Sequence, residues 1–257
     1  MKQFLSITTS VLMALAAFAS PVKSNDAAKG IAYIEDGSSA PTAADYIQDG
    51  LVVALDSLEN SGFGIYNQDA IEWVNLGFGG SVFNATVSSG GFSDMGFIGT
   101  SALQKPHCSE ITVSIVIAQL PNTSLSQNNY PFDAMDSTGG YRLYQHPLNG
   151  VHRFRWVIAR NSAGAVWQPA FLSVDDGVPF SYAFTATSIG NKKSYVNGVG
   201  SQSGAGGQGG YSDGERQTMS LGHLNQAILR LAIYNRPLSD VEIAYNYLID
   251  KERFNLP

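Results

Sequence analysis

Cysteine and charge are both scarce in this sequence. Cys108 is the one cysteine among 257 residues, so no disulfide can form within the chain. A domain of this length holds its core without covalent help, and we expect Cys108 to be a small buried apolar side chain. Charged residues make up 14% of the chain, and the formal net charge is −6. This balance argues against nucleic acid or an anionic membrane surface as the main partner.

Long apolar runs are also rare, and the only prominent one lies at the N-terminus. Lys2 precedes an apolar run over residues 4–18, and Ala17-Phe18-Ala19 gives a small-x-small cleavage pattern. This layout predicts a secretory signal peptide over residues 1–24 and a secreted or cell-surface protein after its removal. Loss of Lys2 and Lys23 takes the formal charge from −6 to −8. No later run reaches the roughly 20 apolar residues of a membrane span.

Short apolar runs alternate with turn residues through the rest of the chain. Residues 25–45 are small and polar and predict a linker or an edge segment. Beyond them the spacing is typical of an all-β sandwich or barrel. In 111–118 the odd positions are apolar, whereas Thr112 and Ser114 face the other way, which predicts a half-buried strand. Asn197-Gly198 favours a type I′ hairpin turn. The predicted strands are 51–55, 111–118, 141–146, 151–160, 181–187, 194–196, 218–221 and 227–234.

One helix is predicted near the C-terminus. Ser239 and Glu242 have the spacing of a capping box, in which each side chain accepts a free backbone N–H of the first turn. Leu238 before the cap and Ile243 in the first turn favour a hydrophobic staple. The i, i+3, i+4, i+7 spacing predicts an apolar face made of Val241, Ala244, Tyr245 and Leu248.

The segment that leads into this helix has a distinctive residue order. It runs Leu231-Ala232-Ile233-Tyr234-Asn235-Arg236-Pro237-Leu238-Ser239, followed by Glu242-Ile243 and Asn246-Tyr247. Three shorter segments precede it: Asp49-Gly50-Leu51-Val52, Trp73-Val74-Asn75-Leu76-Gly77 and Tyr195-Val196-Asn197-Gly198. Together they resemble the laminin-G-like (LamG) domains of the concanavalin A-like lectin and glucanase superfamily.

That resemblance implies a fold and a class of function. The implied fold is a two-sheet antiparallel jelly-roll sandwich over residues 46–257, with one short C-terminal helix. Domains of this family bind glycans or cell-surface partners, sometimes with calcium. We therefore expect a secreted, non-catalytic carbohydrate-binding or adhesion domain with a glycan or cell-surface ligand. The alternative is a structural or assembly protein of a cell or particle surface that uses the sandwich to contact a protein partner.

A glycan hydrolase of the same fold is the less favoured alternative. Such enzymes place acids at alternating positions of one strand, because two carboxylates must flank the scissile bond. No glutamate in this chain is followed two residues later by aspartate. The pairs Glu35-Asp36 and Asp175-Asp176 are adjacent in sequence, so on a strand their side chains would point to opposite faces. We therefore expect no enzyme.

No motif requires a cofactor, and calcium is the one metal ion to consider. Calcium binding needs several oxygen ligands that converge from loops. Neither candidate group follows an EF-hand pattern, and acids in turns are common in an acidic protein, so a purely structural role remains open. The candidate ligands are Asp56, Glu59 and Asn60 in one group, and Asp133 with Asp136 in the other.

The segment 141–160 carries the candidate ligand-binding face. A four-residue loop over 147–150 would pair Leu143 with Phe154 and Tyr141 with Trp156 on the buried face. The opposite face would then carry Arg142 beside Arg155, Tyr144 beside Arg153, and His146 near the loop. Facing arginines are unexpected in an acidic chain, so we expect this face to contact an acidic sugar or another anionic group. A solvated face, or pairing with acids of a neighbouring strand, remains the alternative.

The three tryptophans divide between core and surface. Alternation with Phe154 places Trp156 in the core, and Trp73 lies in one of the segments that resemble the family. Trp167 is the one that could instead stack on a sugar ring.

Overall fold

The computed structural model describes residues 40–257, except 79–82, 94–95, 121–128, 137–138, 147–150, 160–165, 170, 176, 189–190, 205–212, 215–216 and 223–225. The predicted signal peptide and most of the predicted linker lie outside these residues. The packed part of the chain includes a short 3₁₀ turn, η2 (Ala43–Asp45), followed by the buried side chains of Tyr46 and Ile47.

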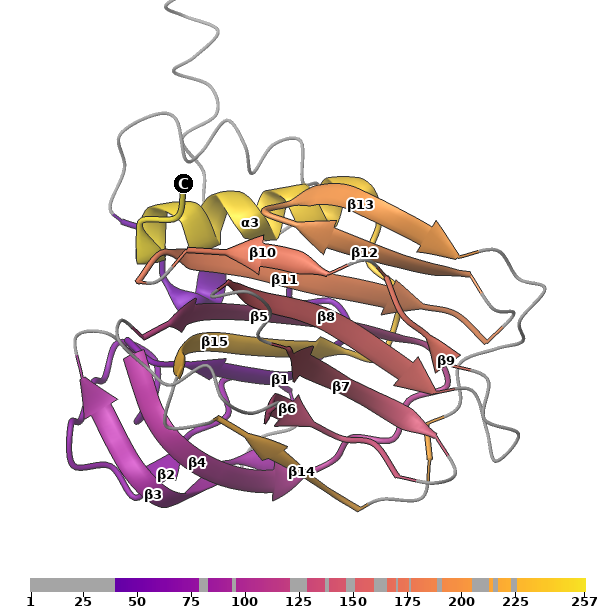
Figure 1. The fold of residues 1–257 in the computed structure, drawn as a ribbon. Helices are drawn as coiled ribbons and strands as arrows, with labels where there is room; N and C mark the ends of the chain where they lie inside the picture. The colour runs from indigo at the N-terminus through magenta and orange to yellow at the C-terminus, as the bar shows by residue number, and fades with distance from the viewer. Residues whose placement is uncertain are drawn as a thin grey trace, which may run out of the picture.

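The described chain is mostly antiparallel β-structure with one C-terminal helix, as predicted (Figure 1). The helix is α3 (Asp240–Phe254). Among the described residues, no helix has the length and apolar content needed to cross a membrane. The strands are β1 (Leu51–Asp56), β2 (Glu72–Trp73), β3 (Ala85–Ser93), β4 (Gly96–Gln104), β5 (Ile111–Gln119), β6 (Asn129–Asp133), β7 (Gly140–Gln145), β8 (His152–Ala159), β9 (Val166–Trp167), β10 (Leu172–Val174), β11 (Pro179–Ala186), β12 (Lys192–Val196), β13 (Val199–Gly204), β14 (Thr218–Leu221) and β15 (Gln226–Tyr234).

These strands form one curled sheet with two limbs. The helix limb has the order β1-β15-β5-β11-β12-β13, and the front limb has the order β2-β3-β4-β14-β6-β7-β8-β10, with β9 also beside β8. The limbs are joined where Ile228 of β15 pairs with Phe97 of β4. A division into two separate sheets is therefore not confirmed in the described part of the chain.

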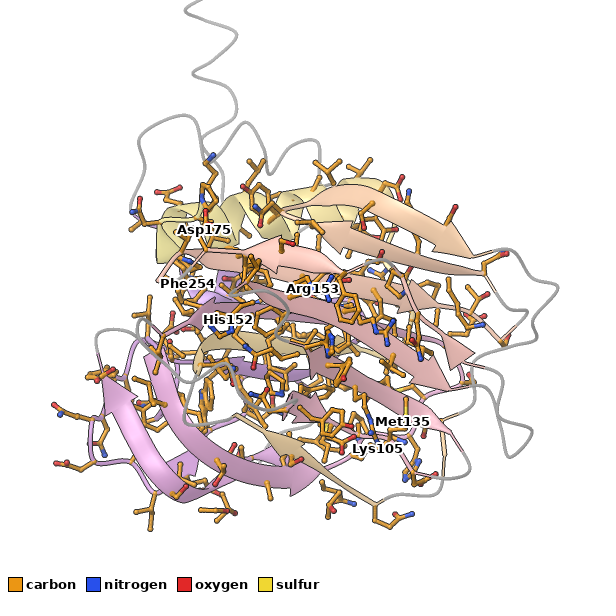
Figure 2. The ribbon with its side chains drawn as sticks, in the orientation of Figure 1. Lys105, Met135, His152, Arg153, Asp175 and Phe254 are labelled. Carbon is orange, nitrogen blue, oxygen red and sulfur yellow. The ribbon has the colours of Figure 1, made fainter. Side chains whose placement is uncertain are left out.

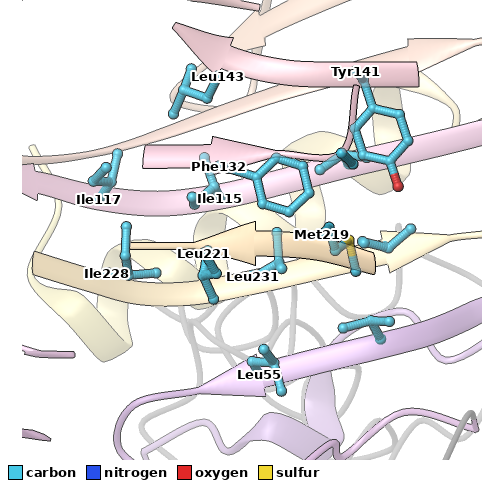
Figure 3. Packing of buried hydrophobic residues seen from close by; sticks show 14 of the residues in the cluster. Leu55, Ile115, Ile117, Phe132, Tyr141, Leu143, Met219, Leu221, Ile228 and Leu231 are labelled. Carbon is cyan, nitrogen blue, oxygen red and sulfur yellow. The ribbon is translucent and has the colours of Figure 1, made fainter. Parts of the chain in front are cut away.

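The main core lies between the two limbs. Ile115 and Leu231 of the helix limb pack in one buried cluster with Phe132 and Leu143 of the front limb (Figure 3). Full burial of such side chains stabilises the fold by about 1.5–3 kcal/mol each. Trp156 belongs to this cluster, so its predicted core position is confirmed, and Trp73 belongs to the same cluster. Cys108 is also buried there, and desolvation raises the pKa of its thiol to about 11.

The local turn and cap predictions are confirmed. Asn197 and Gly198 have φ angles of 48° and 75°, and the flanking Val196 and Val199 pair across the turn. The positive φ at both turn positions is the type I′ requirement that Asn-Gly satisfies. The capping box of Ser239 and Glu242 is present at the start of α3. Leu238 and Ile243 lie in one buried cluster, consistent with the predicted staple.

The predicted apolar face of the helix is wrong. Val241 is 53% exposed, and of the four predicted residues only Tyr245 is buried. The buried side of α3 instead includes two polar residues, because each has a buried partner. Asn246 donates to the hydroxyl of Tyr234, and Asp250 is paired with an arginine. The buried residues of α3 are Ile243, Tyr245, Asn246, Ile249, Asp250 and Phe254.

An ion pair under α3 joins the helix to the sheet. Arg230 Nη1 lies 3.2 Å from Asp250 Oδ1, and both side chains are almost fully buried. The Tyr46 hydroxyl donates to Asp250 at 2.9 Å, and its ring lies 3.9 Å from the Arg230 guanidinium carbon. Desolvation raises the pKa of the Asp250 carboxyl, although Arg230 opposes that shift. The segment before α3 covers Thr112 of β5, because the Thr112 hydroxyl donates to the C=O of Arg236 and accepts the N–H of Leu238. Residues 111–118 are all buried, so β5 is buried on both faces and not half-buried as predicted.

Candidate functional site

The hairpin of β7 and β8 has a register two residues away from the predicted one. Leu143 pairs with Trp156, and Tyr141 pairs with Ile158. A shift of two residues preserves the face of each side chain, because strand side chains alternate with a period of two. The inward faces of both strands are therefore buried as predicted. The predicted loop 147–150 lies outside the described residues, but the closing pair is His146 with Arg153, whose backbone N–H and C=O are 2.8 Å apart.

A buried hydrogen bond accompanies this longer connection. His152 is 4% exposed, and its Nδ1 lies 2.6 Å from Gln145 Nε2. Gln226 of the helix limb donates to Gln145 Oε1 at 2.7 Å. The observed register thus brings together hydrogen-bonded side chains of three strands, β7, β8 and β15. The predicted register takes account only of the length of the turn.

Because the observed register differs from the predicted one, the residues that face each other on the outer side of the hairpin also differ. Arg142 lies opposite Val157, and Tyr144 lies opposite Arg155. The predicted opposition of Arg142 and Arg155 is therefore wrong. The observed register avoids placing two like charges directly across from each other, an arrangement that destabilises a strand pair.

Aromatic rings interleave with arginines on this face, which we call the aromatic–arginine surface. The Arg142 guanidinium carbon lies 4.5 Å from the centre of the Tyr130 ring. The same carbons of Arg153 and Arg155 lie 4.7 and 4.3 Å from the centre of the Phe171 ring. Each such contact contributes about 0.5–1 kcal/mol at an exposed site. Figure 2 marks Arg153 on β8. The surface consists of Tyr130, Arg142, Tyr144, His146, Arg153, Arg155 and Phe171.

Five predicted site residues thus lie on one surface. They are Arg142, Tyr144, His146, Arg153 and Arg155. Tyr144 contacts three other residues of this surface. Its hydroxyl lies 3.3 Å from His146 Nδ1, and its ring lies beside Tyr130 and Phe171. Sequence reasoning missed Tyr130 and Phe171, because β6 and β10 were not predicted as strands. The short alternation Tyr130-Pro131-Phe132-Asp133 was the available signal for β6.

Trp167 is placed differently from the other candidates. It belongs to the two-residue strand β9, and its backbone pairs with Ile158 of β8. Its side chain lies outside the described residues, so its predicted role in sugar stacking stays a prediction.

The three arginines of the surface differ in their electrostatic partners. Arg142 Nε lies 3.1 Å from Asp133 Oδ1. Arg153 and Arg155 have no carboxylate within 4.0 Å among the residues that the structure describes. Their Nε atoms are buried without a hydrogen-bond partner, while each side chain remains partly exposed. Within the part of the chain that the structure describes, these two cations are therefore held mainly by aromatic packing.

The first group of predicted calcium ligands is already occupied by protein contacts. Arg253 Nη2 lies 2.8 Å from Asp56 Oδ2, and Arg253 Nη1 lies 3.0 Å from Glu59 Oε1. Asn60 accepts the backbone N–H of Asn67 and donates to its C=O, both at 2.8 Å. Burial raises the pKa of the Asp56 carboxyl, although Arg253 opposes the shift. The oxygens therefore bind an arginine and a loop backbone, and they do not converge on a metal position.

The second group is divided in a similar way. Asp133 pairs with Arg142 and accepts the backbone N–H of Met135 at 3.1 Å. Asp136 accepts the backbone N–H of Gly139 at 3.1 Å. Within the described ranges, no group of three or more histidine, cysteine, aspartate or glutamate side chains has the arrangement of a metal site.

Among the comparisons with known proteins, only the comparison with solved structures gives matches. No family model and no curated protein matches the sequence. The chain is similar to a botulinum neurotoxin serotype G binding domain, with TM-score 0.58 and 13% identity over 78% of this chain and 51% of that chain. A serotype D binding domain gives TM-score 0.51 and 16% identity over 79% of this chain and 52% of that chain. The chain therefore shares a β-rich fold with about half the length of these two binding domains.

Proposed function

We propose that this protein is a secreted, non-catalytic carbohydrate-binding or cell-surface adhesion domain of the laminin-G-like, concanavalin A-like jelly-roll type. The sequence segments that resemble that family support the fold assignment. The structural likeness to receptor-binding domains supports a binding role. One similar solved structure is a neurotoxin binding domain in complex with SialylT, and another is in complex with rat synaptotagmin II. Those ligands belong to those proteins, and the chain spans about half of each.

The aromatic–arginine surface is the proposed ligand site, and the pair Arg153 and Arg155 is the observation that carries it. In a chain of net charge −6, two adjacent arginines have no acidic partner in the described part. Arginine offers a planar set of donors that matches a carboxylate or a sulfate. Tyr130, which is 42% exposed, adds an aromatic face beside Arg142. This combination favours an anionic glycan whose sugar ring lies against an aromatic side chain.

Affinity at one such site is expected to be modest. Exposed charge pairs contribute about 0.2–1 kcal/mol each, and cation–π contacts at the surface are of similar size. Strong attachment to a cell surface would therefore need several copies of the domain bound at once, because linked sites raise the effective concentration.

A glycan array tests this proposal. The array compares neutral, uronate-containing, sialylated and sulfated glycans, so that carboxylate and sulfate ligands are distinguished. We expect the wild-type chain to bind anionic glycans and the Arg153→Ala/Arg155→Ala variant to bind at least about tenfold more weakly. The matched control is Lys193→Ala/Lys251→Ala, which removes the same charge from the helix side and should change binding by less than about twofold.

Two outcomes would contradict the proposal. Equal binding by the Arg153→Ala/Arg155→Ala variant would place the ligand on another surface. Failure of the wild-type chain to bind any glycan would contradict the carbohydrate function. A second array in the presence of a chelator addresses calcium separately, and we expect binding to be retained because the candidate acids bind protein groups.

A further inference from the structure

The loop between β1 and β2 has an unusual distribution of side chains. Its polar residues Glu59 and Asn60 are 5% and 0% exposed, whereas Phe63, Ile65 and Tyr66 are 56%, 54% and 44% exposed. Surface loops normally place polar groups outside and apolar groups inside. Six of the eleven large apolar side chains that are exposed in the described part of the chain lie between residues 58 and 78, so exposed apolar surface is concentrated in this one region.

The loop is also fixed by its own hydrogen bonds. Glu59 accepts the N–H of Ala43 and the N–H of Gly64 through its two carboxylate oxygens, and it pairs with Arg253. Five of the seven backbone N–H groups in residues 61–67 are satisfied within the loop. They belong to Ser61, Gly62, Gly64, Ile65 and Asn67. The exposed apolar side chains are therefore presented by a pre-organised backbone.

The tip of the loop faces open space and carries no charge. A Cβ placed on Gly64 would have no heavy atom within 4 Å, and residues 60–68 include no acidic or basic side chain. Backbone groups that are hydrogen-bonded within the loop lose less free energy when the loop leaves bulk water for the headgroup boundary of a membrane, because unpaired polar groups are costly to desolvate. Tyrosine and phenylalanine are also favoured at the boundary between lipid headgroups and acyl chains.

We infer that Phe63, Ile65 and Tyr66 insert together into the headgroup boundary of a zwitterionic lipid membrane. The exposed acids Asp69 and Glu72 follow the tip, and with the net negative charge of the chain they disfavour an anionic lipid surface. This contact does not depend on the aromatic–arginine surface. If both operate, insertion of the loop would raise the effective concentration of the domain near a membrane-attached ligand.

Flotation with phosphatidylcholine vesicles tests the inference on the chain from residue 25 to residue 257. We expect the wild-type chain to float with the vesicles and the Phe63→Ser/Ile65→Ser/Tyr66→Ser variant to lose at least about tenfold in bound fraction. The control variant is Val178→Ser/Val199→Ser, which removes two exposed apolar side chains from other parts of the chain and should float like the wild type. Thermal unfolding of all three proteins shows whether a loss of binding reflects a loss of folding.

A single-site probe gives an independent readout. Phe63→Trp places an indole at the tip, and we expect its fluorescence emission to shift to shorter wavelength when vesicles are added. Equal flotation of the triple variant and the wild type would overturn the inference, as would stronger binding to phosphatidylserine than to phosphatidylcholine vesicles. Sedimentation that shows wild-type self-association, abolished in the triple variant without vesicles, would assign the loop to a second copy of the chain and would also overturn it.

Discussion

The two outer faces of the curled sheet use arginine in opposite ways. On the helix limb, α3 covers the sheet, and Arg230 lies under it with 2% exposure and a carboxylate partner in Asp250. On the front limb, Arg153 and Arg155 are partly exposed, stack on Phe171 and have no acidic partner in the described chain. The same residue type is thus buried in an ion pair on one face and partly exposed beside an aromatic ring on the other.

Desolvation explains this difference. A buried guanidinium group loses its hydration, and the folded state tolerates that loss only with a close, hydrogen-bonded counter-ion. A partly exposed guanidinium group keeps part of its hydration, so aromatic packing is sufficient to hold it. An arginine that is covered by the helix therefore requires a carboxylate partner, whereas a partly exposed arginine does not. We therefore expect substitutions on the two faces to have different effects on stability.

The largest effect is expected for Asp250→Ala. This change leaves Arg230 buried without a carboxylate, and breaking such a pair costs about 3–5 kcal/mol in the free energy of unfolding. Urea denaturation measures the loss. Asp49→Ala is the matched control, because Asp49 pairs with Arg236 at 2.9 Å but its side chain is 55% exposed, and we expect a cost below about 1 kcal/mol. Equal costs for the two variants would show that burial does not separate the two kinds of ion pair.

A smaller effect is expected from the pH dependence of the helix cap. Burial acts to raise the pKa of Glu242, but hydrogen bonds from Arg236 and Ser239 outweigh it and the pKa lies below its ordinary value of 4.5. A carboxyl with a lowered folded-state pKa stabilises the fold above the unfolded-state value, and this stability is lost as the pH falls through the folded-state value.

Glu242→Gln should therefore reduce the dependence of stability on pH. Thermal melts between about pH 3 and pH 7 would show a smaller loss on acidification for this variant than for the wild type. Glu252→Gln, at an exposed position of the same helix, is the matched control for the loss of one negative charge from α3. An unaltered profile for Glu242→Gln would mean that the cap does not contribute to acid sensitivity.

The smallest effect on stability is expected on the front limb. Arg153→Ala/Arg155→Ala removes two cations that have no ion pair in the described chain, so the free energy of unfolding should change by less than about 1 kcal/mol. Arg230→Ala is the buried counterpart, and it should cost considerably more because it leaves Asp250 unpaired. A large loss for the front-limb variant would assign Arg153 and Arg155 to the fold and not to a ligand.

Regular local patterns were predictable from the sequence. The position of strand β5 in the sequence and the core position of Trp156 depend on near neighbours in the chain, and so do the Asn197-Gly198 turn and the cap at Ser239. Strands with weak patterns were missed. β3 and β13 are rich in serine and glycine, and β10 is only three residues long, so their β-structure depends on pairing with strands that lie elsewhere in the sequence.

The candidate site was predicted in part for the same reason. Period-two alternation placed Arg142, Tyr144, Arg153 and Arg155 on one face, and that placement survives a register shift of two residues. The cross-strand neighbours of these residues, however, differ from those predicted because of the register shift. Phe171 contacts the arginines from the residue just before β10, and no local pattern in the sequence predicted that contact.

The sequence by itself determined where chain direction changes and which side of each patterned strand faces the core, because turns, caps and alternation are set by residues close together in the chain. Only the tertiary structure decided the strand register, the burial of polar residues such as Asp250 and the contact of Arg153 and Arg155 with Phe171. Those features depend on contacts between segments distant in sequence, where desolvation and hydrogen-bond partners outweigh local preference.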